Sequence, residues 1–183
     1  MNNDAAGLHA QISAVREDAA KLLTGLTESN FNWRPDPNHW SIAQCFDHLN
    51  VLGFLYLPQL SEKIAKSSSL SGEQNYRLGF IGKFFVRSME PPVKSKFKAP
   101  KSFIPAPEKS LVTVAPEFMK LQDLLEDQIN AAENVNWARV KVVSPASKLI
   151  RLNLTEALAI IVAHERRHLW QAWQVRKNPN FPD

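Results

Sequence analysis

The segment 154–175, LTEALAIIVAHERRHLWQAWQV, has the repeat of a long amphipathic helix. Seven residues spaced alternately three and four apart lie on one stripe of that helix: Leu154, Ala157, Ile161, His164, His168, Gln171 and Val175. We expect the helix to be capped by Asn153 or Thr155 and to continue to about Arg176. Two histidines one turn apart therefore face the same way as the apolar residues around them.

Three further helices are predicted from the rest of the chain. The first has an apolar stripe made of Leu8, Ile12, Val15, Ala19, Leu22 and Leu26. The second begins at Ser41, which forms a capping-box pattern with Gln44, and ends near Ala65. The third begins at Pro116, a residue suited to the first turn of a helix, and ends near Asn134.

Little strand signal accompanies these helices, apart from an extended stretch at 138–143. Four amphipathic helices of this length predict an all-α fold, a four-helix bundle. Because the chain has 183 residues, we expect a single domain over 1–183. A long basic, proline-rich insertion at about 70–112 separates the second helix from the third.

Prolines dominate the second half of the insertion. They exclude a continuous helix and favour extended backbone at Pro91, Pro92, Pro100, Pro105 and Pro107. Before them, the segment 76–89 predicts a short helix. Its apolar side carries Phe80, Ile81, Phe84, Phe85 and Met89. Phe97, Phe103 and Ile104 indicate that the insertion packs back onto the body of the domain.

The net charge of +4 comes from a local excess of basic residues in the insertion. These residues are Arg77, Lys83, Arg87, Lys94, Lys96, Lys98, Lys101 and Lys109, against Glu90 and Glu108 alone. A basic stripe can contact nucleic acid or an anionic substrate. However, the chain has no zinc-finger, helix-turn-helix or RNP pattern, so we expect a solvated loop and no nucleic-acid partner.

Cysteine content and hydropathy indicate the compartment. Cys45 is the single cysteine, which excludes an internal disulfide, and we interpret it as a buried, inert thiol. The longest apolar run, 157–163, is far shorter than the roughly 18 residues of a membrane span. The first residues, MNNDAAGLHAQ, have neither the basic start nor the apolar core of a signal peptide. A cytoplasmic protein without a membrane partner is therefore expected.

A third histidine lies on or near a second inward stripe. His48 belongs to the series Ser41, Cys45, His48, Leu52, Leu55 and Gln59, spaced alternately four and three apart. Three imidazoles on facing stripes need partners, and a divalent metal supplies them, since an i, i+4 pair plus one histidine from a neighbouring helix makes three nitrogen ligands. The alternative is that these are ordinary core histidines. His9 and His39 are interpreted as surface or packing residues.

The segment 164–168, HERRH, also matches the zinc-protease motif H-E-x-x-H. That interpretation requires a third ligand further along the chain. The residues after His168 contain no histidine, no glutamate and one aspartate side chain, that of Asp183. We therefore reject the protease hypothesis.

Two parts of the chain resemble the DinB-like superfamily. Residues 31–35, FNWRP, followed by 40–49, WSIAQCFDHL, are similar to the approach to that superfamily's second helix. Residues 164–171, HERRHLWQ, resemble its closing motif H-x-x-x-H-x-x-Q. The parts stand in the family's order, and the likeness covers essentially the whole chain. Leu169 and Trp170 depart from it, since many members have Arg-Gly before the glutamine.

The resemblance implies an up-and-down bundle, often dimeric, that holds a divalent metal, usually zinc or nickel, through His48, His164 and His168. Better-understood relatives are thiol-dependent, among them bacillithiol S-transferases and mycothiol-dependent maleylpyruvate isomerases. The leading hypothesis is thus a metal-dependent enzyme that activates a low-molecular-weight thiol. Gln171 would orient a ligand or contact the substrate, although a plain hydrogen bond between helices is an equally good role.

Two alternatives stay open. A metal-dependent hydrolase would activate water at the same site, and Glu165 is then the candidate base, about 100° round the helix from His164. A non-catalytic metal-binding module, structural or stress-related, is the other, because helices of this length fold without metal. The expected partner is a small-molecule substrate or thiol. A homodimer is compatible with Trp170 and Trp173, which core packing explains equally well.

Overall fold

The computed structural model describes residues 2–69, 73–93, 100 and 103–182. In this part of the chain the elements are α1 (Ala5–Leu23), α2 (Glu28–Asn32), α3 (Ile42–Ala65), α4 (Phe80–Met89), α5 (Leu111–Ala131), β1 (Lys141–Val143), β2 (Arg151–Asn153) and α6 (Leu154–Arg176). Helices predominate and the two short strands form one antiparallel pair, so the all-α prediction is confirmed. No described helix has the length and apolar character needed to span a bilayer.

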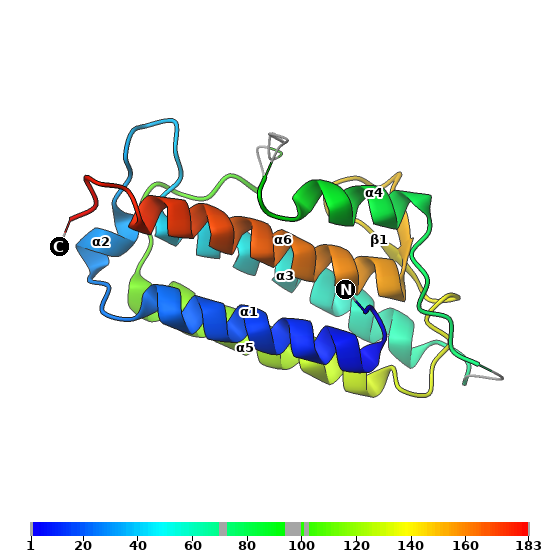
Figure 1. Cartoon of the computed structure of the whole chain (residues 1–183). Helices are drawn as coiled ribbons and strands as arrows, with labels where there is room; N and C mark the ends of the chain where they lie inside the picture. Colours follow the sequence, from blue (N-terminus) through cyan, green and yellow to red (C-terminus); the bar gives the residue numbers. More distant parts are fainter. Residues whose placement is uncertain (1, 70–72, 94–99, 101–102, 183) are drawn as a thin grey trace.

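Four long helices form the body of the molecule. α3 packs against α5 and α6, and α1 packs against the same two helices. α1 and α6 run in one direction, whereas α3 and α5 run in the other (Figure 1). The predicted stripe of the first helix was wrong at Leu26, which lies beyond the end of α1 at Leu23. From Leu8 to Leu22 the stripe is the buried face of α1. It joins a single core whose largest fully buried side chains include Trp137, Phe31, Phe46 and Phe118.

The start of α3 follows the capping-box prediction. The backbone N–H of Gln44 donates to Ser41 Oγ, and the N–H of Ser41 donates to Gln44 Oε1, both at 3.1 Å. Both residues are buried, so these bonds satisfy donors that water cannot reach. α3 ends at Ala65, as predicted. The predicted start of the last helix is also confirmed, because Asn153 caps α6 by accepting from the N–H of Glu156 at 2.8 Å.

The bounds predicted for the third long helix are wrong. α5 begins at Leu111 and contains Pro116, because both carboxylate oxygens of Glu28 accept from the N–H of Leu111 at 2.9 Å. This hydrogen bond lowers the pKa of Glu28. Pro116 costs the helix one bond, to the carbonyl of Val112, a residue that is 77% exposed and can be solvated. At its other end α5 closes into a turn after Ala131.

The structure adds elements that the sequence pattern did not indicate. α2 is a single turn capped by Thr27, and it was not predicted. β1 lies within the predicted extended stretch 138–143, but β2 was not predicted. Val142 and Leu152 pair across this hairpin and are both buried, so the hairpin covers the end of the core where α6 begins.

The short helix of the insertion begins at Phe80, later than the predicted residue 76, and packs along α6 as α4. Gly82 allows this approach, since a Cβ there would lie 2.6 Å from Glu156 Cγ. Three residues of the predicted apolar side are exposed: Phe80, Ile81 and Phe84. They face away because α4 contacts α6 on its other side.

The rest of the insertion agrees with prediction in part. Phe103 is buried against the body of the domain. Ile104 is 54% exposed, so the packing predicted for it is wrong. Five residues of this prediction and of the basic stripe lie outside the described residues: Lys94, Lys96, Phe97, Lys98 and Lys101.

The capping box can be tested by mutation. Ser41→Ala should lower the free energy of unfolding by about 1 kcal/mol, because it removes the acceptor of a buried N–H. Chemical denaturation measures this change. Ser68→Ala, at an exposed position after α3, is the control and should change it by less than about 0.5 kcal/mol. Equal effects of the two substitutions would contradict the role of the capping box.

Candidate metal centre

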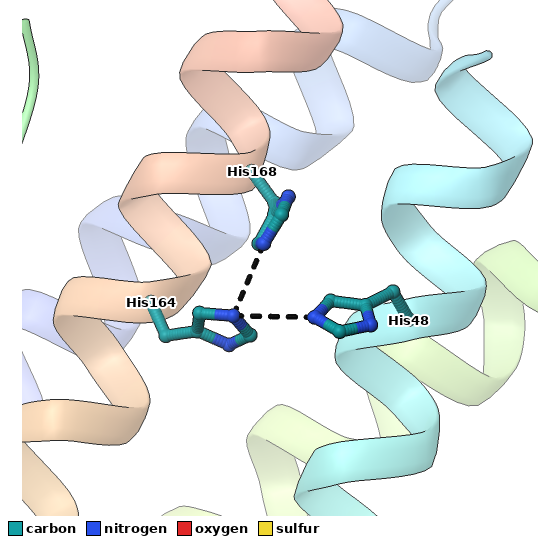
Figure 2. A group of neighbouring side chains, drawn as sticks. All are labelled: His48, His164 and His168. Carbon is teal, nitrogen blue, oxygen red and sulfur yellow. Dashed lines mark hydrogen bonds between the residues drawn. The ribbon is translucent and has the colours of Figure 1, made fainter. Parts of the chain in front are cut away.

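Three histidines from two helices converge on one point. His48 comes from α3, while His164 and His168 come from successive turns of α6, and their rings point toward one another (Figure 2). The Nε2 atom of His164 lies 3.3 Å from that of His48 and 3.0 Å from that of His168. His48 and His168 are buried and His164 is partly buried. The structure therefore brings together the three residues that the sequence singled out.

The far nitrogens of two rings are held by oxygen acceptors. His48 Nδ1–H donates to the carbonyl oxygen of Phe103 at 2.8 Å, and His168 Nδ1–H donates to Gln171 Oε1 at 3.1 Å. A neutral imidazole carries one proton, so protonation at Nδ1 leaves Nε2 with a free lone pair. The partners thus select the tautomer that presents a ligand atom to the centre of the cluster.

A count of protons shows why a cation fits this cluster. With both neighbours protonated at Nδ1, only His164 can carry a proton on Nε2. One proton cannot make a full hydrogen bond to both His48 and His168, so at least one buried lone pair lacks a proper donor. A divalent ion accepts all three lone pairs, and every ligand atom lies within 4.8 Å of the others. The cluster could therefore hold a divalent metal.

Burial keeps these imidazoles neutral. It is the largest of the causes that together lower the pKa of His164 to about 3, the others being His48 and then Arg167. It also lowers the pKa of His168 well below the usual value, with help from His164 and His48. The pKa of His48 is lowered by burial as well, against the opposing effect of the Phe103 carbonyl. Neutral imidazole is the form that binds a metal.

Two residues of the site were not identified as such from the sequence. Trp40 stacks on His168 with ring centroids 5.5 Å apart and also lies 5.0 Å from the ring of His48. Its position directly before the Ser41 cap was the available signal. Phe103 acts through its backbone carbonyl, which no side-chain pattern can reveal.

The remaining candidate residues lie outside the histidine cluster. Glu165 is buried on another side of α6, where its Oε1 accepts from Gln122 Nε2 at 2.9 Å, and burial raises its pKa to about 7. Burial also raises the pKa of the Cys45 thiol, which fits an inert core residue. His39 is exposed and bonds Asp36 at 2.7 Å.

Comparison with models of known protein families establishes the family of this chain. The model of the DinB superfamily matches residues 11–172, a span that contains all three histidines and Gln171. The chain belongs to the DinB superfamily. No curated protein and no solved structure matches it significantly.

In this DinB-superfamily chain the histidines open onto a cavity of about 740 Å³. α3, α4, α6 and the hairpin all contribute to its lining, as do Trp40 and Phe103. Glu165 and Gln171 line it too. A metal in the cluster would therefore face a space large enough for a small-molecule ligand.

The lowered pKa values predict how the metal-free protein responds to pH. The unfolded chain takes up protons on these histidines near pH 6.5, whereas the folded chain does not until lower pH. Stability is therefore full above about pH 6.5 and is lost as the pH falls toward about 3, the folded pKa of His164. Urea unfolding with a chelator at about pH 7 and about pH 5 measures this loss.

The variant His164→Gln isolates the histidine contribution from that of the carboxylates. Its loss of stability between the two pH values should be smaller than that of the wild type by about 2 kcal/mol. His9→Gln, at a position outside the cluster, should leave the loss as in the wild type. Identical pH dependence of the wild type and His164→Gln would show that His164 is not held neutral.

Proposed function

We propose that this protein is a metal-dependent enzyme whose divalent ion is held by His48, His164 and His168, and that it activates a low-molecular-weight thiol for S-transfer. The observation that carries the proposal is the convergence of three Nε2 atoms, two of them with the opposite ring nitrogen already hydrogen-bonded to an oxygen. Three imidazole nitrogens suit zinc or nickel.

A metal held by these three histidines would leave an open coordination position, and it would lower the pKa of a thiol bound there. The chain's own residues do the rest. Gln171 and the Phe103 carbonyl hold His168 and His48 in the tautomer that binds. Trp40 covers both rings, so that it limits the access of water to this side of the cluster.

The organisation of the protein is part of the same proposal. The packing of α1, α3, α5 and α6 supports a four-helix bundle, with residues 70–112 as its insertion. We propose a single domain over 1–183 that acts in the cytoplasm as a homodimer, on a small molecule and without nucleic acid.

A hydrolase that activates water is the second candidate. Glu165 favours it, because its Oε2 atom is buried without a hydrogen-bond partner among the described residues and the side chain lines the cavity. Turnover that requires a thiol separates the transferase from the hydrolase. Metal-dependent melting without turnover of either kind would favour the non-catalytic module.

Metal content tests the ligand set. Purified protein incubated with zinc or nickel and freed of excess should retain about one ion per chain. His48→Ala, His164→Ala and His168→Ala should each abolish stoichiometric binding, because each removes one of three ligands. Elemental analysis measures the ratio. His9→Ala and His39→Ala are the controls and should bind as the wild type does; the same ratio in all five variants would contradict the proposal.

Gln171 offers a test of the outer hydrogen bond. Gln171→Leu should weaken zinc binding by about 10- to 100-fold, since the acceptor that orients His168 is lost. Gln171→Glu keeps an acceptor and should bind close to wild type. Competition with a chromophoric chelator gives the affinities. The matched control is Gln174→Leu, which also lines the cavity; an equal loss there would assign the effect to the cavity wall.

A further inference from the structure

The polarity of the residues that line the cavity beside the histidines changes along its length. On α3, Leu52 and Tyr56 follow His48 by one and two turns, and on α6, Ile161 precedes His164 by almost one turn. Because α3 and α6 run in opposite directions (Figure 1), these residues lie at the same end of the cavity. The opposite end, beyond His168, is lined by Asn38, Trp40, Gln171 and Gln174.

We call the first end the apolar section, lined by Leu52, Tyr56, Phe85, Ile150, Leu152 and Ile161. Its length along α3, from His48 to Tyr56, is about 12 Å. At its far end the Tyr56 hydroxyl donates to Ser144 Oγ at 3.3 Å, and that oxygen also accepts from the N–H of Ala146. Both hydroxyls therefore have a hydrogen-bond partner within the protein, so the far end does not require a polar ligand.

The charged side chains that line the cavity lie near the histidines. Among the described residues they are Glu165 and Arg167, which flank His164 and His168 on α6. Glu165 is bonded to Gln122, and Arg167 donates to the carbonyl of Ser88 at 3.2 Å. A charged ligand group inside the apolar section would lose its hydration without gaining an opposite charge, which is unfavourable.

α4 forms one wall of the cavity, and hydrogen bonds hold this wall against the rest of the domain. Glu90, at the end of α4, accepts from Arg166 Nε of α6 at 3.0 Å, and the same guanidinium donates to Gln11 of α1 at 3.0 Å. This link holds Phe85 over the apolar section while Phe84 faces outward, 56% exposed. The apolar section is therefore held in shape by contacts within the fold.

We infer that the substrate of this protein is an elongated molecule whose uncharged, mainly apolar part lies in the apolar section, with its reactive end at the three histidines. The inference rests on the proposed function, since it names the class of molecule that the metal site would act on. A large polar thiol does not suit this end of the cavity, because its carboxylate groups would find no oppositely charged side chain among the described residues that line the apolar section.

The uncharged fluorescent probe N-phenyl-1-naphthylamine tests this inference by direct titration. The wild type should bind it with increased fluorescence, with or without zinc. Leu52→Asp should weaken binding by at least about tenfold, because it places a carboxylate in the apolar section. If Leu52→Asp does not fold, Phe85→Asp takes its place and should weaken binding of the probe in the same way. Cysteine, a small polar thiol, should not displace the probe.

Two controls exclude binding to the outer surface. The first control is Leu55→Asp. Leu55 is on the same helix as Leu52, but its side chain is 44% exposed and does not line the cavity. The second control is Phe84→Asp. Phe84 is next to Phe85 in the chain but is on the exposed face of α4. Both should bind the probe within about twofold of the wild type, since neither changes the apolar section. Loss of binding in Phe84→Asp, with Leu52→Asp unaffected, would overturn the inference.

Zinc content measured on the same preparations separates the two proposals. Stoichiometric zinc without probe binding would overturn the inference and leave the proposed metal site intact. Probe binding that depends on Leu52, in a protein that takes up no zinc, would support the apolar ligand and contradict the metal-dependent enzyme. The variant His164→Ala should lose zinc and keep the probe.

Discussion

The antiparallel packing of α3 against α6 is the constraint on which the site depends. It sets His48 opposite His164 and His168, so that their Nε2 atoms lie about one hydrogen-bond length apart. Imidazoles buried in this way need defined partners, because an unsatisfied buried polar group costs on the order of 1–3 kcal/mol. The oxygens of Phe103 and Gln171 satisfy two of the outer nitrogens. At least one inner lone pair is left without a proper donor, and the cluster could hold a divalent metal there.

The segment proposed as an insertion, 70–112, contributes α4 and Phe103 to the site, although its composition resembles that of a solvated loop. Phe103 supplies the acceptor for His48, and α4 covers the cavity through Phe85 and Met89. At the end of the insertion, Lys109 pairs with Asp47, the residue before His48, at 3.1 Å. A change in the length of this segment would therefore alter the hydrogen bonding of a histidine and the shape of the cavity together.

The predictability of each feature depended on how local its cause is. The Ser41 and Asn153 caps and the stripe of α1 from Leu8 to Leu22 follow from contacts between near neighbours in the chain, and these were found as expected. The start of α5 was missed because its cap comes from Glu28, far away in the sequence. Trp40 was missed as a site residue for the same kind of reason, since its stacking partner His168 lies on the last helix.

The amino-acid sequence by itself determined the four long helices and the three histidines that meet, because helical periodicity is a property of residues three and four apart. The inward stripe predicted through His48 was wrong at Leu55, which is 44% exposed. The sequence also carried the DinB-superfamily pattern. Only the tertiary structure decided which nitrogen of His48 and His168 faces the centre, and that the cavity is apolar on one side of them. The ring orientations and the polarity of the cavity depend on residues that folding brings together from α3, α4, α6 and the hairpin. Contacts between residues so far apart in the chain leave no local sequence pattern.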